Sequence, residues 1–385
     1  MVDAPPHGSR WILERADFPS FLKALEAAGY RVLGPTVRDG AIVYGEIRRE
    51  EDLPIGWTDR QDAGRYRLER RSDAALFGYN LGPHSWKKYL FPSRERLWTA
   101  TRSGGSFEAE PEPTDARPMA FLGIRACELA GLDVSDRVFD GVTHDPGYRG
   151  RRQGILRVAV QCGQSGATCF CVSMGTGPGV TRGFDLSLTE LLGPGGHRFL
   201  VEVGTPAGAA VLRDLPLRSA DPAATDEAER IVAHTAASMG RSLDTTGIHD
   251  LLLSRPEHPR WEIVAKRCLS CTNCTMACPT CFCSTTEEVP SLDGDRVETW
   301  RRWDSCFNLE FSQLHAVSVR KSPMSRYRQW LTHKLAGWYD QFDSSGCIGC
   351  GRCITWCPVG IDLTEEVAAI RTGPAKAVPP SGGAP

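Results

Sequence analysis

Eight cysteines fall into two runs with the same spacing. The segments CLSCTNCTMACP and CIGCGRCITWCP both follow the pattern Cys-x2-Cys-x2-Cys-x3-Cys-Pro. In such a run a tight loop can turn three thiolates toward one iron–sulfur cube, while the fourth points toward a neighbouring cube. The repeat therefore predicts two 4Fe–4S clusters and single-electron chemistry. The residues are Cys268, Cys271, Cys274 and Cys278 in the first run and Cys347, Cys350, Cys353 and Cys357 in the second.

The spacing also predicts which cysteine serves which cluster. In bacterial two-cluster ferredoxins each run gives three ligands to one cluster and its last cysteine to the other. Pro279 and Pro358 follow the last cysteines and fix φ at the start of the departing chain,. We therefore expect a crossed assignment. Cluster one would be held by Cys268, Cys271, Cys274 and Cys357, and cluster two by Cys278, Cys347, Cys350 and Cys353.

Zinc and disulfides are the competing interpretations of these cysteines. Paired Cys-x2-Cys motifs bind zinc, but a zinc ribbon uses two pairs and not two triplets that each precede a fourth cysteine and a proline. The chain has fifteen cysteines, an odd number, and its first residues lack the apolar segment of a secretory signal,. Cluster ligation in a reducing compartment explains this pattern better than disulfide pairing, so we expect a cytoplasmic protein.

Four more cysteines follow predicted strands in the N-terminal region. The apolar runs RPMAFLGI and ILRVAVQ each lead to a cysteine, and TCFC returns two further thiols before the glycine-rich stretch SMGTGPG. Thiolates from neighbouring strand ends could hold a third 4Fe–4S cluster. The Cys-x-Cys spacing is tight for one cluster, and buried free thiols are the alternative. We expect the third cluster on Cys127, Cys162, Cys169 and Cys171.

Three cysteines remain outside these groups, namely Cys281, Cys283 and Cys306. A fourth ligand for them is not evident, although His315 or a partner residue could complete a site. We expect them to be structural thiols or thiols that support the nearby ligands.

The elements that must position these cysteines indicate a mixed α+β fold. Residues 17–29 have a helical pattern that ends at a glycine, and Asp39-Gly40 is a turn between two β-rich runs,. A mainly helical ferredoxin-like part follows. The expected divisions are a mixed α/β domain at 1–220 able to hold the third cluster, a helical connector at 221–258, a two-cluster domain at 259–371 with an insertion at 280–346, and a disordered tail at 372–385.

Composition excludes several other classes of protein. The 385 residues carry a formal net charge of −2, which gives no argument for nucleic-acid binding,. No apolar run approaches the roughly 20 residues that span a bilayer. A dinucleotide fingerprint, a P-loop and a nucleophile–base motif are all missing from the sequence,. We therefore expect no catalytic residue and no flavin or nucleotide site in this chain.

Longer segments add a family resemblance. GIRACELAGLDVSDRVF, TCFCVSMGTGP, CLSCTNCTMACPTCFC, WDSC and CIGCGRCITWCPVGID together resemble one family. It comprises the iron–sulfur β subunit of cytosolic sulfhydrogenase-type NiFe hydrogenases and the corresponding iron–sulfur subunit of anaerobic sulfite reductases. The likeness runs from about Phe18 to Ile370, and RACELAGLD followed by TCFCVSMGTGP is its most specific part.

The resemblance implies an electron-transfer subunit of a larger oxidoreductase, with no catalysis of its own. The implied partners are a flavin- and NAD(P)H-binding subunit and the large and small subunits of a NiFe hydrogenase. The alternative within the family is the iron–sulfur subunit of an anaerobic sulfite reductase, which would serve a sulfite reductase catalytic subunit. A redox-sensing module with a labile cluster is a second alternative, although no effector or nucleic-acid domain is evident.

Overall fold

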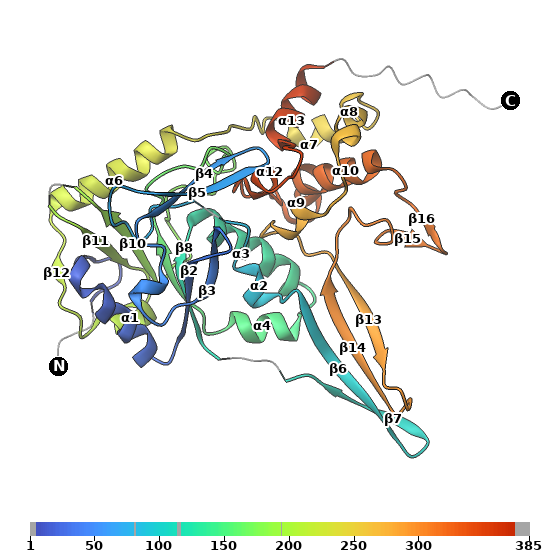
Figure 1. The fold of residues 1–385 in the computed structure, drawn as a ribbon, viewed down its shortest axis with the longest axis horizontal. Helices are drawn as coiled ribbons and strands as arrows, with labels where there is room; N and C mark the ends of the chain where they lie inside the picture. Colours follow the sequence, from blue (N-terminus) through green and yellow to red (C-terminus); the bar gives the residue numbers. More distant parts are fainter. Residues whose placement is uncertain (1–4, 81, 114–116, 194, 374–385) are drawn as a thin grey trace.

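The computed structural model describes residues 5–80, 82–113, 117–193 and 195–373. A large sheet with helices on both faces adjoins a helical region that contains both cysteine runs (Figure 1). The predicted mixed α+β fold, with its ferredoxin-like C-terminal part, is confirmed. The division into domains stays a prediction. The predicted tail at 372–385 lies outside the described residues from 374 onward.

The large sheet has eight strands in the order β12-β1-β11-β10-β9-β8-β2-β3. Its central neighbours β2, β8, β9 and β10 run parallel, and the outer pairs are antiparallel. Parallel neighbours end at the same edge, which brings the loops that follow them together. The strands are β1 Arg10–Glu14, β2 Arg31–Arg38, β3 Ala41–Glu46, β8 Met119–Ile124, β9 Leu156–Val160, β10 Leu186–Leu191, β11 Arg198–Val203 and β12 Arg218–Ser219.

Helices cover both faces of this sheet. On one face, α1 and α5 pack with strand residues such as Leu122 and Val158. On the other face, Leu129 and Leu132 of α3 pack on Phe121. Strand side chains alternate between the two faces, so both can be buried. The helices are α1 Phe18–Ala27, α2 Lys87–Leu90, α3 Ala126–Phe139, α4 Pro146–Arg152, α5 Pro206–Leu212 and α6 Pro222–Ala237, with 3-10 turns η1 Arg15–Asp17 and η2 Glu50–Asp52.

The helix, the turn and the strands that the sequence predicts in this region are confirmed. The helix expected at 17–29 forms as α1, and the Asp39-Gly40 turn joins β2 to β3. Both turn residues have positive φ, 51° and 71°, as a tight hairpin turn requires,. The apolar runs around 117–124 and 155–161 form the buried strands β8 and β9.

The C-terminal helices form a separate core around aromatic side chains. Trp261, Tyr327 and Trp330 are buried and pack together with Phe307. The helix at 323–332 is capped by Ser322, whose side chain accepts a hydrogen bond from the Ser325 amide. The elements are α7 Ile248–Leu253, α8 Arg260–Arg267, α9 Asn273–Met276, α10 Pro323–Thr332, a π-helical turn η3 His333–Gly337, α11 Trp338–Phe342, α12 Arg352–Thr355 and α13 Leu363–Thr372.

Two distant segments of the chain form a projecting four-stranded sheet. Its order is β13-β14-β6-β7, so the insertion between the cysteine runs pairs with a hairpin from the N-terminal region. The sheet extends away from the body of the molecule (Figure 1). Its strands are β6 Arg94–Ser103, β7 Ser106–Pro111, β13 Ser284–Pro290 and β14 Arg296–Trp303, and the smaller hairpins are β4 Trp57–Asp62 with β5 Arg65–Arg70 and β15 Gln313–Leu314 with β16 Val317–Ser318.

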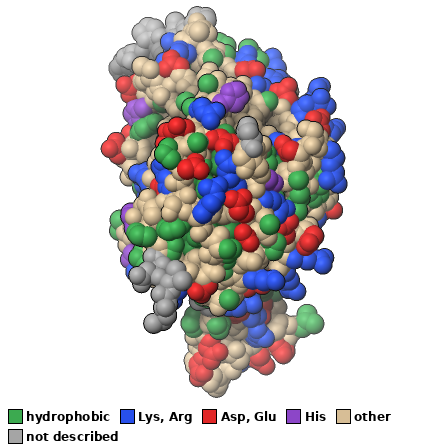
Figure 2. All heavy atoms as spheres, turned by 90° about the vertical axis from the view of Figure 1, so that its left-hand side faces the viewer, with side chains coloured by type: hydrophobic (Ala, Val, Ile, Leu, Met, Phe, Trp, Pro, Cys, Tyr) green, Lys and Arg blue, Asp and Glu red, His purple; other side chains and the backbone are tan. Residues whose placement is uncertain are grey.

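The surface mixes both signs of charge. Figure 2 shows Lys and Arg side chains interspersed with Asp and Glu on the face viewed from the left of Figure 1. This agrees with the small net charge of −2. Among the helices of the described residues, none is long and apolar enough to cross a membrane.

Candidate iron–sulfur sites

The two cysteine runs fold into loops with the same backbone conformation. Ser270 and Gly349, two residues after the first cysteine of each run, have positive φ of 51° and 66°. Thr272 and Gly351, directly after the second cysteine, have φ of 70° and 73°. A short helix, α9 or α12, follows each loop. The sequence repeat is therefore a repeat of structure, and each loop turns its first three cysteines to the same side.

The first cysteine group joins three residues of one run to the last cysteine of the other. Burial raises the pKa of the Cys274 thiol well above its usual range, and the nearby Cys268 and Cys357 raise it further. Cys271, which is exposed, also lies beside Cys274. A cavity of about 30 Å³ opens among these thiols. The structure thus brings together Cys268, Cys271, Cys274 and Cys357, as the crossed assignment expects.

The second group has the reciprocal composition. Burial raises the pKa of Cys353 well above its usual range, with further increases from its neighbours Cys347 and Cys350 and from Cys278. Cys278 belongs to the first run but lies beside all three thiols of the second. The members placed together are Cys278, Cys347, Cys350 and Cys353.

The four N-terminal cysteines form a third group. Cys127 is the second residue of α3, and Cys162 follows β9, so parallel strands β8 and β9 deliver both to one edge of the sheet. Burial raises the pKa of Cys171, and its neighbours Cys169 and Cys162 raise it further. Cys127 in turn lies beside Cys171 and Cys162. The thiols of Cys127, Cys162, Cys169 and Cys171 therefore share one buried site.

The third group lies against the loop of the second group. The Phe170 amide donates to the Gly349 carbonyl at 2.9 Å, and the Thr176 hydroxyl donates to the Ile348 carbonyl at 2.7 Å. A Cβ at Gly349 would lie 2.7 Å from the Cα of Cys171, so only glycine fits there,. Cys350 of the second group is a close neighbour of the third-group thiols. The two groups are adjacent.

A buried ion pair holds these two groups in place. Arg352, next to Cys353, donates to the Glu128 carboxylate on α3 at 2.6 Å, and both side chains are almost fully buried. The Tyr44 hydroxyl and the Trp86 indole N–H also donate to Glu128, at 2.7 and 3.1 Å. Each carboxylate oxygen of Glu128 is thereby satisfied, which a buried charge requires. Sequence reasoning quoted the RACE segment but missed this pairing, because Arg352 lies more than 200 residues away.

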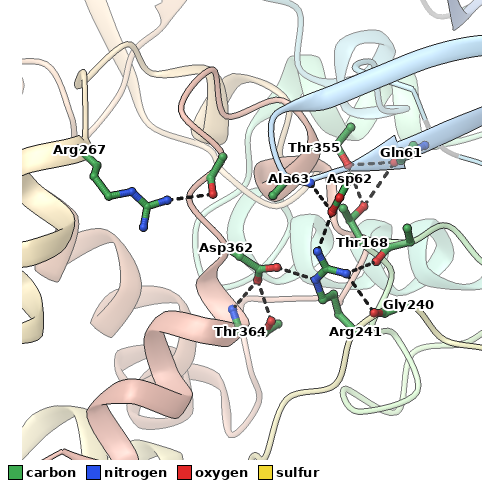
Figure 3. A network of polar contacts seen from close by, with 12 residues as sticks. Gln61, Asp62, Ala63, Thr168, Gly240, Arg241, Arg267, Thr355, Asp362 and Thr364 are labelled. Carbon is green, nitrogen blue, oxygen red and sulfur yellow. Dashed lines mark hydrogen bonds and ion pairs between the residues drawn. The ribbon is translucent and has the colours of Figure 1, made fainter.

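A second polar network is centred on Arg241 (Figure 3). Arg241 donates to the Asp362 carboxylate at 2.6 Å, to Asp62 at 2.8 Å and to the Ala167 carbonyl at 2.9 Å. Nearby, the Thr168 and Thr355 hydroxyls are 2.7 Å apart. The contacts tie the β4–β5 hairpin and the 166–171 loop to the second cysteine loop.

Two buried lysines lie beside the second group, and sequence reasoning missed both. Lys334 donates to Cys278 Sγ at 3.3 Å, and Lys87 donates to the Cys281 carbonyl at 3.0 Å and lies 3.9 Å from the centre of the Trp303 ring. Within the described residues neither ammonium forms an ion pair with a carboxylate. Cysteine side chains face Lys334. Burial lowers the pKa of this lysine, but Cys278 and Cys281 raise it, and the net shift is upward.

The remaining cysteines lie around the base of the β13–β14 hairpin. Cys281 lies beside Cys278, and the thiols of Cys283 and Cys306 neighbour each other. His315, suggested as a further ligand, lies in the exposed turn between β15 and β16.

The chemistry of the first and second groups fits 4Fe–4S ligation. Backbone amides donate toward three of the sulfurs, from Ser270 to Cys268 at 3.4 Å, from Gly349 to Cys347 at 3.5 Å and from Ile361 to Cys357 at 3.3 Å. Hydrogen bonds of this kind help to set cluster potential. Across residues 5–80, 82–113, 117–193 and 195–373, no group of three or more His, Cys, Asp or Glu side chains is arranged to hold a single metal ion.

Comparison with known proteins agrees with this geometry. Residues 267–361 match the family described as 4Fe-4S dicluster domain, which confirms the predicted cofactor class. The whole chain is similar to sulfhydrogenase 2 subunit beta of Pyrococcus furiosus, with 26% identity over 361 residues that cover 92% of this chain and 96% of the relative. These two matches confirm the predicted resemblance. No solved structure matches the chain significantly.

Proposed function

We propose that this chain is the electron-transfer subunit of a cytoplasmic oxidoreductase complex of the NiFe hydrogenase type. The observation that carries the proposal is the contiguity of three thiol groups. The third group adjoins the second through Cys350, and the second adjoins the first, where Cys278 lies beside Cys274. The first group reaches the surface at the exposed Cys271. Three 4Fe–4S clusters held here would lie in a row from the sheet edge to the protein surface.

The proposed ligands are the three groups in their crossed arrangement. When bound, a 4Fe–4S cluster accepts and releases single electrons. The chain supplies the thiolates, the amide donors and the cover. Phe307, Tyr327 and Trp330 line the cavity of the first group, where their rings would shield a bound cluster from water. Arg352 and Lys334 bring positive charge to the second group, which compensates the negative charge of its thiolates,.

The proposed partners follow from the similar relative, which is itself named as a subunit of a sulfhydrogenase. We assign hydrogen chemistry to the large and small subunits of a NiFe hydrogenase and exchange with NAD(P)H to a flavin subunit. This chain would connect them and carry no catalytic residue. The relative favours the hydrogenase branch over a sulfite reductase complex.

Purification of the native complex without oxygen tests this proposal. We expect hydrogenase subunits and a flavin subunit to co-purify with the chain, nickel to be present, and hydrogen to reduce a viologen dye. Co-purification with a sirohaem protein and sulfite-dependent turnover would instead establish the sulfite reductase branch. A chain that purifies alone and loses its iron in mild oxidant would contradict the electron-transfer role.

A further inference from the structure

Cys283 and Cys306 are held close together by the base of the long β13–β14 hairpin. Cys283 directly precedes β13, and Cys306 follows β14 by three residues. The hairpin register pairs Ser284 with Trp303, and the Asp304 amide then donates to the Cys283 carbonyl at 2.8 Å. The two chains therefore leave the hairpin side by side, each carrying a thiol.

Both thiol-bearing segments are anchored by their neighbours. The Ser305 side chain is fully buried and lies 2.8 Å from the Thr275 hydroxyl, and its oxygen accepts from the Phe307 amide at 3.1 Å. On the other segment, the Phe282 ring packs edge-on against Trp338 with centroids 6.2 Å apart. Because both segments are fixed, the two thiols meet at low cost in conformational entropy.

The two thiols lie in direct contact at the base of the hairpin. The side chains of Cys283 and Cys306 are in hydrogen-bond contact with each other. Neither side chain is completely buried. Two partly exposed thiols that touch each other are placed to act as an attacking and a resolving pair in disulfide exchange.

We propose that Cys283 and Cys306 are a redox-active dithiol that closes reversibly to a disulfide. The Cys283 thiolate attacks one sulfur of a small disulfide, whose S–S bond breaks and releases one thiolate. The Cys306 thiolate then attacks the Cys283 sulfur, which forms the internal S–S bond and releases the second small thiolate. The protein loses two electrons and two protons, and the small disulfide gains both.

The pair lies close to both the first and the second cysteine group. Cys306 lies beside Cys274 of the first group, and Lys334, which contacts Cys278 of the second group, lies beside both thiols of the pair. Oxidation removes a thiolate from the neighbourhood of both groups. The ratio of thiol to disulfide in the surroundings would thus change the charge beside the proposed clusters. The dithiol would couple that ratio to electron transfer.

The test uses the full chain with its iron, purified without oxygen and equilibrated with glutathione at several ratios of disulfide to thiol. Acid quenching, alkylation and peptide mass analysis then show which cysteines are linked. We expect a peptide joined through Cys283 and Cys306 to appear reversibly as the disulfide fraction rises. It should be absent from C283S and C306S and retained in the neighbouring control Ser284→Ala.

Iron analysis separates this role from cluster ligation. We expect C283S and C306S to keep the iron content of the unmodified chain. A loss of about four iron atoms in either variant would make the residue a cluster ligand and overturn the dithiol. Complete alkylation of both cysteines at every glutathione ratio would overturn it as well. Co-purification with hydrogenase subunits does not depend on either result, so the dithiol can fail while the proposed function stands.

Discussion

The two cysteine loops have the same spacing and the same backbone, yet their surroundings differ. In the first loop the left-handed positions are Ser270 and Thr272, and Cys271 between them is exposed. In the second loop both positions are glycine, because other parts of the chain press against it. A Cβ at Gly351 would lie 2.3 Å from the Thr168 carbonyl oxygen. One turn geometry thus serves a surface site and an internal junction, and the neighbouring residues decide which side chains it tolerates.

Loss of a whole cluster is the largest effect that the comparison predicts. We expect Cys278→Ala to remove the same paramagnetic signal as Cys347→Ala, because both thiols belong to the second group. Cys357→Ala should remove the signal that Cys268→Ala removes. Each variant should lose about four iron atoms, since a missing thiolate destabilises a site whose binding is coupled to folding. Low-temperature electron paramagnetic resonance after dithionite reduction measures this.

If Cys278→Ala and Cys268→Ala lost the same paramagnetic signal, the crossed assignment would be contradicted. In that case each run would hold its own cluster.

The residues directly before the third cysteine of each loop offer the next test, which concerns stability. Arg352 pairs with Glu128 in the interior, whereas Asn273, its counterpart in the first loop, is exposed and donates to the Trp356 carbonyl at 3.3 Å. We expect Arg352→Met to lower the free energy of unfolding by about 3–5 kcal/mol, because it leaves a buried carboxylate unpaired. Asn273→Ala should cost about 0.5 kcal/mol or less. Urea denaturation under argon measures both.

If both variants lost the same free energy of unfolding, the ion pair between Arg352 and Glu128 would not make the second loop more sensitive than the first. A double variant, Arg352→Met with Glu128→Gln, should recover part of the lost stability because no unpaired charge remains.

A substitution at Gly351, which has a left-handed backbone conformation, should cause a smaller loss of stability. Gly351→Ala places a Cβ against the Thr168 backbone and strains a residue with φ of 73°. We expect a cost of about 2–4 kcal/mol from the overlap and the strain together. The matched change in the first loop, Thr272→Gly, should be neutral or stabilise the protein by about 1 kcal/mol, since it relieves strain at φ of 70°,. A Gly351→Ala variant as stable as the parent would show that the loops do not approach as closely as described.

The smallest expected effect is on the midpoint potential of the second cluster, which depends on the charge of Lys334. Lys334 contacts Cys278. Among the described residues, the neighbours that most affect the pKa of Cys268 and Cys274 are other cysteines and Ser270, not a lysine or arginine. A buried ammonium favours the reduced cluster, which carries more negative charge. We expect Lys334→Met to lower the midpoint potential of the second cluster by roughly tens of millivolts and to leave the first unchanged. A potentiometric titration followed by paramagnetic resonance measures the two midpoints, and equal shifts in both would contradict this asymmetry.

The sequence predicted the local part of this arrangement well. The cysteine spacing defined both loops, and the strand signals before Cys127 and Cys162 indicated that these thiols meet at one sheet edge. Long-range pairings were not predictable. Neither the four-stranded sheet that joins β6 to β14 nor the contact between Glu128 and Arg352 has a signature in nearby residues. The buried lysines were missed for the same reason, because a lysine in a sequence is most often exposed.

The central claim is that the three thiol groups hold three iron–sulfur clusters. Iron and acid-labile sulfide counted per chain in the full-length protein, purified without oxygen, test it most directly. We expect about twelve of each, falling to about eight in Cys127→Ala. Colourless protein without labile sulfide would contradict the claim entirely, and about eight iron atoms in both proteins would remove the third cluster.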